Sequence, residues 1–259
     1  MRKQVIFIII MAAVAWLPAS AKTAQALNIQ MEPNVVQIGA FYNGGQVSVS
    51  GDVPRDAEVI IRLSGATKDV DLLRKGRVLG VLWMNTEMIT FHDIPEAYML
   101  YLPPAINESN LSSDPGRQMP DVGFDALKEK SSLTPAGEDK DFQFQEFIKL
   151  KSREGVYAVH ENTVTYHKKD AHKKTFACEL TIPSRMAQGV YTVTTFILKN
   201  SKVIKTDARQ LRIKETGLPA MISSLAFDHA IFYGILATLI AIAAGLLTGV
   251  IFKGEKGGH

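Results

Sequence analysis

The sequence predicts a mainly β protein, an antiparallel sandwich with a helical insertion, followed by one C-terminal transmembrane helix. Apolar residues recur with period two in short runs separated by Gly, Pro, Asn and Asp, which is typical of antiparallel strands. A polar stretch, residues 103–141, interrupts these runs. Near the end of the chain, Ala230–Phe252 carries no charge and, at about 1.5 Å per residue, exceeds the hydrocarbon thickness of about 30 Å.

Residues 1–26 have the layout of a secretory signal peptide. Arg2 and Lys3 precede an apolar stretch, and Pro18-Ala19-Ser20-Ala21 then supplies small residues at cleavage spacing. Ala24-Gln25-Ala26 is a second possible cleavage site. An uncleaved first membrane span is the alternative, which the short apolar core and Pro18 disfavour. A cleaved leader exports the chain that follows it.

Residues 27–104 form the N-terminal β-rich region. Turn signals are expected at Asn43-Gly44-Gly45, at residues 52–56 and at Lys75-Gly76. Between them, short alternating runs predict eight strands, at residues 27–31, 35–38, 46–50, 58–64, 70–73, 78–83, 88–91 and 97–102.

Residues 105–155 form a loop and helical insertion. Its first half reads as a long loop with a short helix near residues 124–130. A second helix is predicted over residues 141–153, where an apolar stripe recurs at helical spacing and packs most simply on a sheet. Asp139 or Asp141 is available to cap this helix and Gly155 to end it, and its stripe contains Phe144, Phe147, Ile148 and Lys151.

Residues 156–217 form the C-terminal β-rich region. Residues 183–189 lead into Val190-Tyr191-Thr192-Val193, and Lys199-Asn200-Ser201-Lys202 is predicted to be the turn of a closing hairpin. A Gly-x-Tyr-x-Val strand followed by a hairpin is common at the end of immunoglobulin-like sandwiches, where the Tyr packs across a corner. The predicted fold class is therefore an immunoglobulin-like antiparallel sandwich. The two β-rich regions form either one sandwich with an insertion or two domains.

Residues 218–229 precede the predicted span, and residues 253–259 follow it as a short tail. Asp228 and His229 fall at the outer interface, where they are expected to orient the helix. Lys253 and Lys256 favour retention of the tail in the cytoplasm, since positive charge stays inside. The expected topology is single-pass type I, with the bulk of the chain outside.

Small residues recur at every fourth position of the predicted span. Such a line lets a second helix approach closely, and the partner would be a permease helix or a second copy of the chain. Ordinary Ala and Gly content in a span accounts for the pattern equally well. The residues are Ala237, Ala241, Gly245 and Gly249.

Composition excludes some classes of function. The formal net charge of +3 is small and the basic residues are scattered, so the sequence indicates no basic patch of the kind that binds nucleic acid. The single cysteine, Cys178, cannot form an intramolecular disulfide. It shares a predicted strand face with Phe176, Leu180 and Ile182, which indicates a buried, inert thiol.

Several segments, in one consistent order, resemble a conserved transmembrane family of proteobacteria, first noted in alphaproteobacteria. The resemblance implies a signal peptide, a periplasmic β-rich region and one C-terminal span in the inner membrane. It also implies a partner, because such proteins are often encoded beside a permease of the sulfite-exporter type. It implies no activity. The segments are residues 73–85 (LRKGRVLGVLWMN), 94–98, 147–157, 175–193 and 214–234.

A basic cluster within the first of these segments is the best candidate for a binding site. If Gly76 closes a hairpin, the cationic side chains converge on one loop, where guanidinium groups suit sulfate, sulfite, phosphate or an anionic lipid headgroup. A solvated turn whose charges suppress aggregation is the alternative. The anion-binding candidates are Arg74, Lys75, Arg77 and Asn85, near Trp83.

The sequence predicts no enzyme, no metal site and no cofactor. His160, His167 and His172 have spacing that fits no familiar ligand pattern. Gly-x-Ser-x-Gly, the P-loop, the dinucleotide fingerprint and Cys-x-x-Cys-His are absent from the sequence, and nothing pairs a nucleophile with an evident base.

Two hypotheses of function follow from the sequence and the family resemblance. In the first, the chain is a membrane-anchored periplasmic accessory protein, non-catalytic, that assists a sulfite-exporter-type anion permease. In the second, it is an independent periplasmic binding or envelope-structural module that self-associates through its membrane helix.

Overall fold

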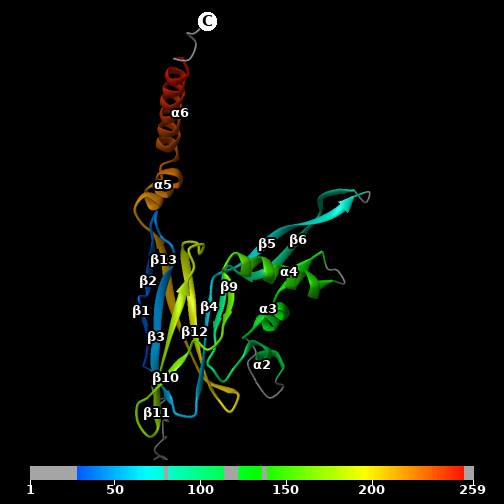
Figure 1. Cartoon of the computed structure of the whole chain (residues 1–259), viewed down its shortest axis with the longest axis vertical. Helices are drawn as coiled ribbons and strands as arrows, with labels where there is room; N and C mark the ends of the chain where they lie inside the picture. The colour runs from blue at the N-terminus through cyan, green and yellow to red at the C-terminus, as the bar shows by residue number, and fades with distance from the viewer. Residues whose placement is uncertain (1–27, 79–80, 114–121, 136–138, 254–259) are drawn as a thin grey trace, which may run out of the picture.

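The computed structural model describes residues 28–78, 81–113, 122–135 and 139–253, drawn in colour in Figure 1. Strands make up 48% and helices 27% of the chain, with several antiparallel sheets and one C-terminal apolar helix, which confirms the predicted fold class. The signal-peptide prediction, for residues 1–26, lies outside the described residues, as does most of the C-terminal tail.

Two larger sheets form the body of the molecule. The first is fully antiparallel, with the order β1-β3-β11-β10. The second has the order β2-β13-β12-β4-β7-β9 and includes two parallel pairs, β13 with β2 and β7 with β9. Strand bounds in the first sheet are β1 Ile29–Glu32, β3 Gly45–Pro54, β10 Thr165–Lys168 and β11 Lys173–Ile182. In the second they are β2 Val35–Ile38, β4 Glu58–Ser64, β7 Tyr98–Tyr101, β9 Tyr157–His160, β12 Gly189–Lys199 and β13 Lys202–Glu215.

Both sheets combine strands from before and after the helical insertion. In the first sheet β3 pairs with β11, and in the second β4 pairs with β12. The two β-rich regions of the sequence therefore share their sheets.

The core lies between these sheets, and two tyrosine hydroxyls connect them. Tyr101 on β7 donates its hydroxyl hydrogen to the carbonyl of Thr181 on β11 at 3.1 Å. Tyr166 on β10 accepts the backbone N–H of Val59 on β4 at 2.9 Å. Tyr101 is buried and Tyr166 is half-buried, so each hydroxyl needs such a partner. Central strand β4 is buried over most of its length, consistent with its position between β12 and β7.

The predicted turns have mixed outcomes. The turn after Lys199 is confirmed: Asn200 and Ser201 have φ of 50° and 62°, the geometry of a two-residue hairpin turn with both central residues left-handed. Tyr191 is buried and donates to the carbonyl of Ala187 at 2.9 Å, so it does pack across a corner. The turn expected over residues 52–56 is shorter, because β3 continues to Pro54.

The insertion packs beside the second sheet. Predicted helix α3, Phe124–Lys130, is confirmed, whereas α2, Glu108–Ser113, and the short strand β8, Ser132–Thr134, were not expected. Helix α4, Lys140–Arg153, buries Phe144 and Phe147 as predicted. Asp139 occupies its N-cap position without a side-chain hydrogen bond, and Gly155, with φ of 77°, follows its end.

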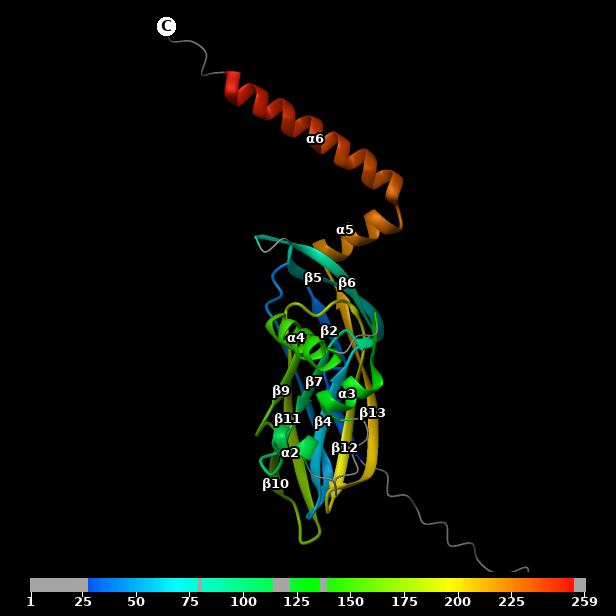
Figure 2. The same cartoon turned by 90° about the vertical axis from the view of Figure 1, so that its right-hand side faces the viewer.

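A third sheet, β5-β6-β8, projects from the body (Figures 1 and 2). Its main part is a long hairpin of β5, Thr67–Val78, and β6, Leu82–Pro95.

The chain ends in two helices. Strand β13 leads through Thr216 and Gly217 into α5, Leu218–Phe227, and then α6, Ala230–Lys253, extends away from the body (Figure 1). Within α6, Ala230–Phe252 is long and apolar enough to cross a membrane.

Candidate functional site

An aromatic cluster fixes the root of the β5–β6 hairpin to the body. Phe91 on β6 stacks on Phe147 of α4, with ring centroids 4.7 Å apart. Phe147 also meets Tyr157 of β9 edge to face at 5.8 Å, and Tyr157 donates to the carbonyl of Pro95 at 2.6 Å. Buried aromatic pairs of this geometry add to the free energy of burial. The root of the hairpin is therefore held by both α4 and the second sheet.

The hairpin does not reverse where the sequence predicted. Gly76 lies opposite Met84 within the ladder, and the chain reverses between Val78 and Leu82, so the predicted turn at Lys75-Gly76 is wrong. The predicted strand 78–83 is wrong for the same reason, since it runs across the reversal. Gly76 has another role: a Cβ there would lie 2.8 Å from Cγ2 of Thr86.

Thr86 is the extra residue of a β-bulge. Arg74 pairs with Glu87 and Lys75 with Asn85, which leaves Thr86 without an opposite residue. Its hydroxyl donates to the carbonyl of Arg74 at 3.2 Å. The glycine therefore provides room for the bulged side chain instead of making a turn, and bulges of this kind bend a hairpin.

The predicted anion-binding residues do not converge on one loop. Arg74 lies 3.5 Å from the carboxylate of Glu87, whereas the guanidinium of Arg77 lies over the indole of Trp83, 5.0 Å from the ring centroid. Lys75 and Asn85 are opposite each other on the two strands. The expected convergence is wrong because Gly76 continues the strand, which spreads the cations along the hairpin. Anion binding by these residues stays a prediction.

Four consecutive large apolar side chains are exposed at the tip of the hairpin. Val81 is 85% exposed, and Leu82 and Trp83 are each 62% exposed. Met84 is exposed as well. Sequence analysis did not assign these residues to a site. The signal was present in the sequence, because a half-buried strand alternates apolar and polar residues, whereas this run is apolar throughout and follows three basic residues.

A groove of about 470 Å³ separates the hairpin from α4. Its floor contains Ile89, Phe91 and Phe147, and its rim has Arg74 and Lys75 on the hairpin side. On the helix side, Phe142 and Leu150 are exposed apolar residues that sequence analysis also missed. The volume lies within the range of ligand pockets, and the groove combines an apolar floor with a charged rim, with Arg74 and Lys75 on the hairpin and Glu146 on α4.

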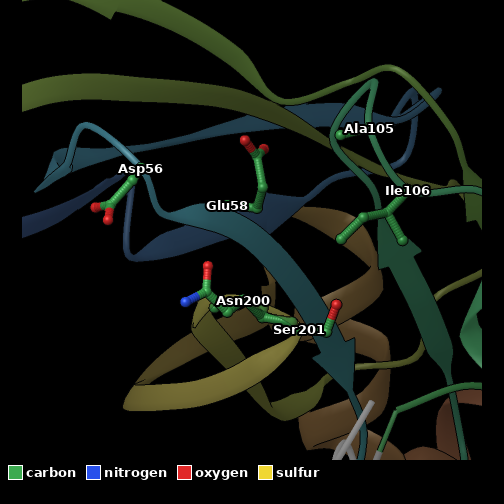
Figure 3. A pocket seen from close by; sticks show the side chains of 7 residues that line it. Asp56, Glu58, Ala105, Ile106, Asn200 and Ser201 are labelled. Carbon is green, nitrogen blue, oxygen red and sulfur yellow. The ribbon is translucent and has the colours of Figure 1, made fainter. Parts of the chain in front are cut away.

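A second, smaller pocket of about 90 Å³ lies between the β3–β4 and β12–β13 turns. Figure 3 shows that the carboxylate of Glu58 points away from Asn200 and Ser201, and that Asp56 lies apart from Glu58. Asp56 also binds Lys199 at 2.7 Å, and this hydrogen bond lowers the pKa of Asp56. Glu58 is 3.2 Å from Lys174. These carboxylates are compensated by lysines and do not form a pair suited to acid–base chemistry.

Cys178 and the three histidines lie at separate places in the fold. Cys178 is buried, as predicted, and burial raises the pKa of its thiol to about 12. His160 stacks on Tyr101 at 4.8 Å, and burial lowers the pKa of its imidazole. His160 lies on β9, His167 on β10 and His172 in the loop before β11. In the part of the chain that the structure describes, no three His, Cys, Asp or Glu residues gather as a metal site would require.

The small-residue line of α6 is open to a partner. A Cβ added at Gly245 or Gly249 would meet no atom of the chain within 4 Å. The two threonines of the helix donate to backbone carbonyls four residues earlier, Thr238 to Gly234 and Thr248 to Ala244, each at 2.8 Å. Their hydroxyls are thus satisfied inside the helix, as a lipid environment requires.

Comparison with known proteins gives one family. The chain matches no curated protein and no solved structure. The model of a family described as "Putative transmembrane protein (Alph_Pro_TM)" matches residues 26–254, which include the whole β body, the hairpin and the apolar helix. The chain belongs to this alphaproteobacterial-type transmembrane family.

Proposed function

We propose that the protein is a non-catalytic accessory subunit, anchored in the inner membrane, whose periplasmic body acts on a membrane partner bound through α6. The observation that carries this proposal is the exposed small-residue line of α6. Every side chain from Ala230 to Phe252 is exposed, so the helix has no partner within the described chain. Close helix packing through Ala and Gly is a main source of helix association in lipid.

The proposed topology is type I. Residues 1–26 have the pattern of a leader, and Lys253 and Lys256 follow the span, which favours a cytoplasmic C-terminus. Membrane association itself is supported by the family and by the apolar helix. A reporter fused after His259 would be active on the cytoplasmic side only, whereas protease added to spheroplasts would digest the body.

The proposed partner is an anion permease of the sulfite-exporter type, as family resemblance implies. The hairpin side of the groove beside α4 agrees with this choice, because Arg74 and Lys75 there would attract an anionic substrate to the body, while Glu146 lines the helix side. Crosslinking in native membranes followed by mass spectrometry identifies the partner. Permease peptides support the accessory role, and crosslinks between copies of the chain alone support the self-associating module instead.

The contact through α6 has its own test. Replacing Gly245→Leu and Gly249→Leu together is expected to remove the partner from pull-downs, since bulky side chains hold the helices apart. Ala243→Leu with Val250→Leu is the matched control, because both residues lie on the opposite face of α6 at 100° per residue. Equal co-purification of both variants would contradict the proposed contact.

Anion binding can be measured on the full chain in detergent. Calorimetric titration with sulfite, sulfate and phosphate is expected to give heat for the wild type, and Arg74→Ala with Lys75→Ala, which removes both cations that line the groove, is expected to abolish it. Arg209→Ala removes an exposed guanidinium from β13, where it binds Asp207 at 3.0 Å, and serves as the control. Flat traces for the wild type would contradict anion binding while leaving the contact through α6 intact.

A further inference from the structure

Exposed apolar side chains gather at the end of the body from which α6 departs. Glu215, the last residue of β13, pairs with Ile38, and Thr216 donates to the carbonyl of Ile38 at 2.8 Å. The β2–β3 loop and the start of α5 therefore lie together. Phe41 in that loop is 99% exposed. Helix α5 adds four exposed apolar residues, Leu218, Met221, Ile222 and Phe227.

The tip of the β5–β6 hairpin reaches the same end of the molecule. In both views it rises to the level of α5; it lies to one side of α6 in Figure 1 and beneath the inclined α6 in Figure 2. Its exposed residues Val81, Leu82, Trp83 and Met84 are thus placed at the level where the chain enters its membrane helix.

The chemistry of the tip suits a bilayer surface. Residues 74–86 contain three cations and no carboxylate. The guanidinium of Arg77 covers one face of the Trp83 indole, so an aromatic ring and a cation lie side by side as they do at membrane interfaces. Neighbouring residues on a strand point to opposite faces, and Leu82, Trp83 and Met84 are all exposed, so both faces of the tip are apolar. A protein partner would cover one face, whereas lipid surrounds both.

We propose that the hairpin tip inserts into the interface of the bilayer that α6 spans, forming a second membrane contact. Leu82, Trp83 and Met84 lie at the boundary of headgroups and acyl chains, and Lys75 and Arg77 bind lipid phosphates. Insertion is shallow, because a two-stranded hairpin leaves backbone groups on its outer edges that need water or headgroups. Together with Phe41 and α5, the tip holds the body at a fixed orientation over the membrane. This inference does not depend on the identity of any protein partner.

The test uses the full chain and Trp83 as a fluorescent reporter. Trp16 belongs to the proposed leader, and Trp16→Phe ensures that Trp83 is the sole tryptophan even in chains that retain it. The purified chain is reconstituted in phosphatidylethanolamine and phosphatidylglycerol vesicles that contain doxyl-labelled lipid. A label near the headgroups is expected to quench Trp83 about twofold more strongly than a label deep in the acyl chains. Water-like emission without quenching by either label would overturn the proposal and assign the tip to a protein partner, which these vesicles lack.

Two further variants control this measurement. Trp16→Phe, Trp83→Phe and Ile204→Trp together move the reporter to the β12–β13 hairpin at the far end of the body, where neither lipid label is expected to quench it. Leu82→Ser with Met84→Ser, in the Trp16→Phe background, keeps Trp83 and is expected to lose most of the quenching. Both sites are exposed, so circular dichroism should show an unchanged fold. Unchanged quenching in the serine variant would count against insertion of the tip.

Discussion

The root and the tip of the β5–β6 hairpin belong to one ladder but are used differently. At the root, Ile89, Phe91 and Ile94 are buried against α4 and the second sheet. At the tip, Leu82 and Trp83 are exposed although they are equally apolar. The bulge at Thr86 lies between these two parts.

This difference shows that hydrophobicity serves two purposes within fourteen residues of one strand, β6. Root residues stabilise the fold, since their burial removes apolar area from water. Tip residues add nothing to the core, and exposed apolar patches of this kind mark interaction sites, which agrees with the proposed contact with lipid. Substitutions at the root should therefore change stability, and substitutions at the tip should change binding.

Thiol labelling gives the largest expected contrast between core and hairpin. The pKa of buried Cys178 is raised to about 12 by burial, whereas an exposed thiol has a pKa of about 8.5, so the thiolate fractions near neutral pH differ by roughly three orders of magnitude. Met88→Cys places a second thiol at an exposed position of the hairpin. One fast equivalent of label is expected for this variant and none for the wild type until denaturant is added. Rapid labelling of native wild type would show that the core is open.

Truncation at the root gives the next largest effect. Phe147→Ala removes a ring that contacts Phe91, Phe144 and Tyr157, and it is expected to lower the free energy of unfolding by about 3–5 kcal/mol. Trp83→Ala at the tip is the matched control, with an expected change within about 0.5 kcal/mol. Urea unfolding of the full chain in detergent, followed by circular dichroism, measures both. Similar losses for the two variants would remove the distinction between root and tip.

A substitution at the bulge between root and tip should change both stability and lipid contact, but the loss of stability should be smaller than for Phe147→Ala. Gly76→Ala places a Cβ against the Thr86 side chain, which must rotate and give up its hydrogen bond to the carbonyl of Arg74. We expect a loss of stability of about 0.5–1.5 kcal/mol, because a hydrogen bond is lost. We also expect weaker quenching of Trp83 by lipid labels, because a changed bulge alters the direction in which the tip points. Thr86→Ala removes the same hydrogen bond without the steric conflict. Full lipid quenching in Gly76→Ala would show that the bulge does not aim the tip.

The smallest expected effect is a pH dependence of the body. Burial lowers the pKa of His160 below its ordinary value of 6.5, so the unfolded chain binds that proton more readily. Stability from this group is present above pH 6.5 and is lost as the pH falls from there toward the folded pKa. His160→Phe keeps an aromatic ring against Tyr101 and is expected to flatten this part of the pH profile. Identical profiles for variant and wild type would exclude His160 as the source.

Local sequence patterns predicted much of the body. Strands 35–38 and 58–64 have the expected bounds, as does helix α3, because alternation and helical spacing are set by which face is buried. The C-terminal span was also readable, since an uncharged apolar run of this length is typical of a helix that crosses a bilayer. The turn at Asn200-Ser201 was also predictable, because Asn and Ser favour tight turns through interactions with their own neighbouring backbone.

The hairpin was less predictable because its glycine was ambiguous. Gly76 between charged residues is typical of a turn, yet here it makes room for Thr86 in a bulge, which depends on the opposite strand. The error placed Arg74, Lys75 and Arg77 on one loop. Likewise, Phe142 and Leu150 could not be assigned to a groove from helical spacing alone, since the groove exists only where α4 meets the hairpin.

Strand β13 also determines how the body would respond to mechanical tension from its anchor. It continues through Thr216 and Gly217 into α5, and it lies between β12 and β2 within the second sheet. Tension from the anchor enters the body at the end of β13, and the part of it that acts along this strand would shear the hydrogen bonds to both neighbours at the same time. Shearing many bonds together requires more force than opening them one after another, so the attachment of the sandwich to the bilayer should resist tension well.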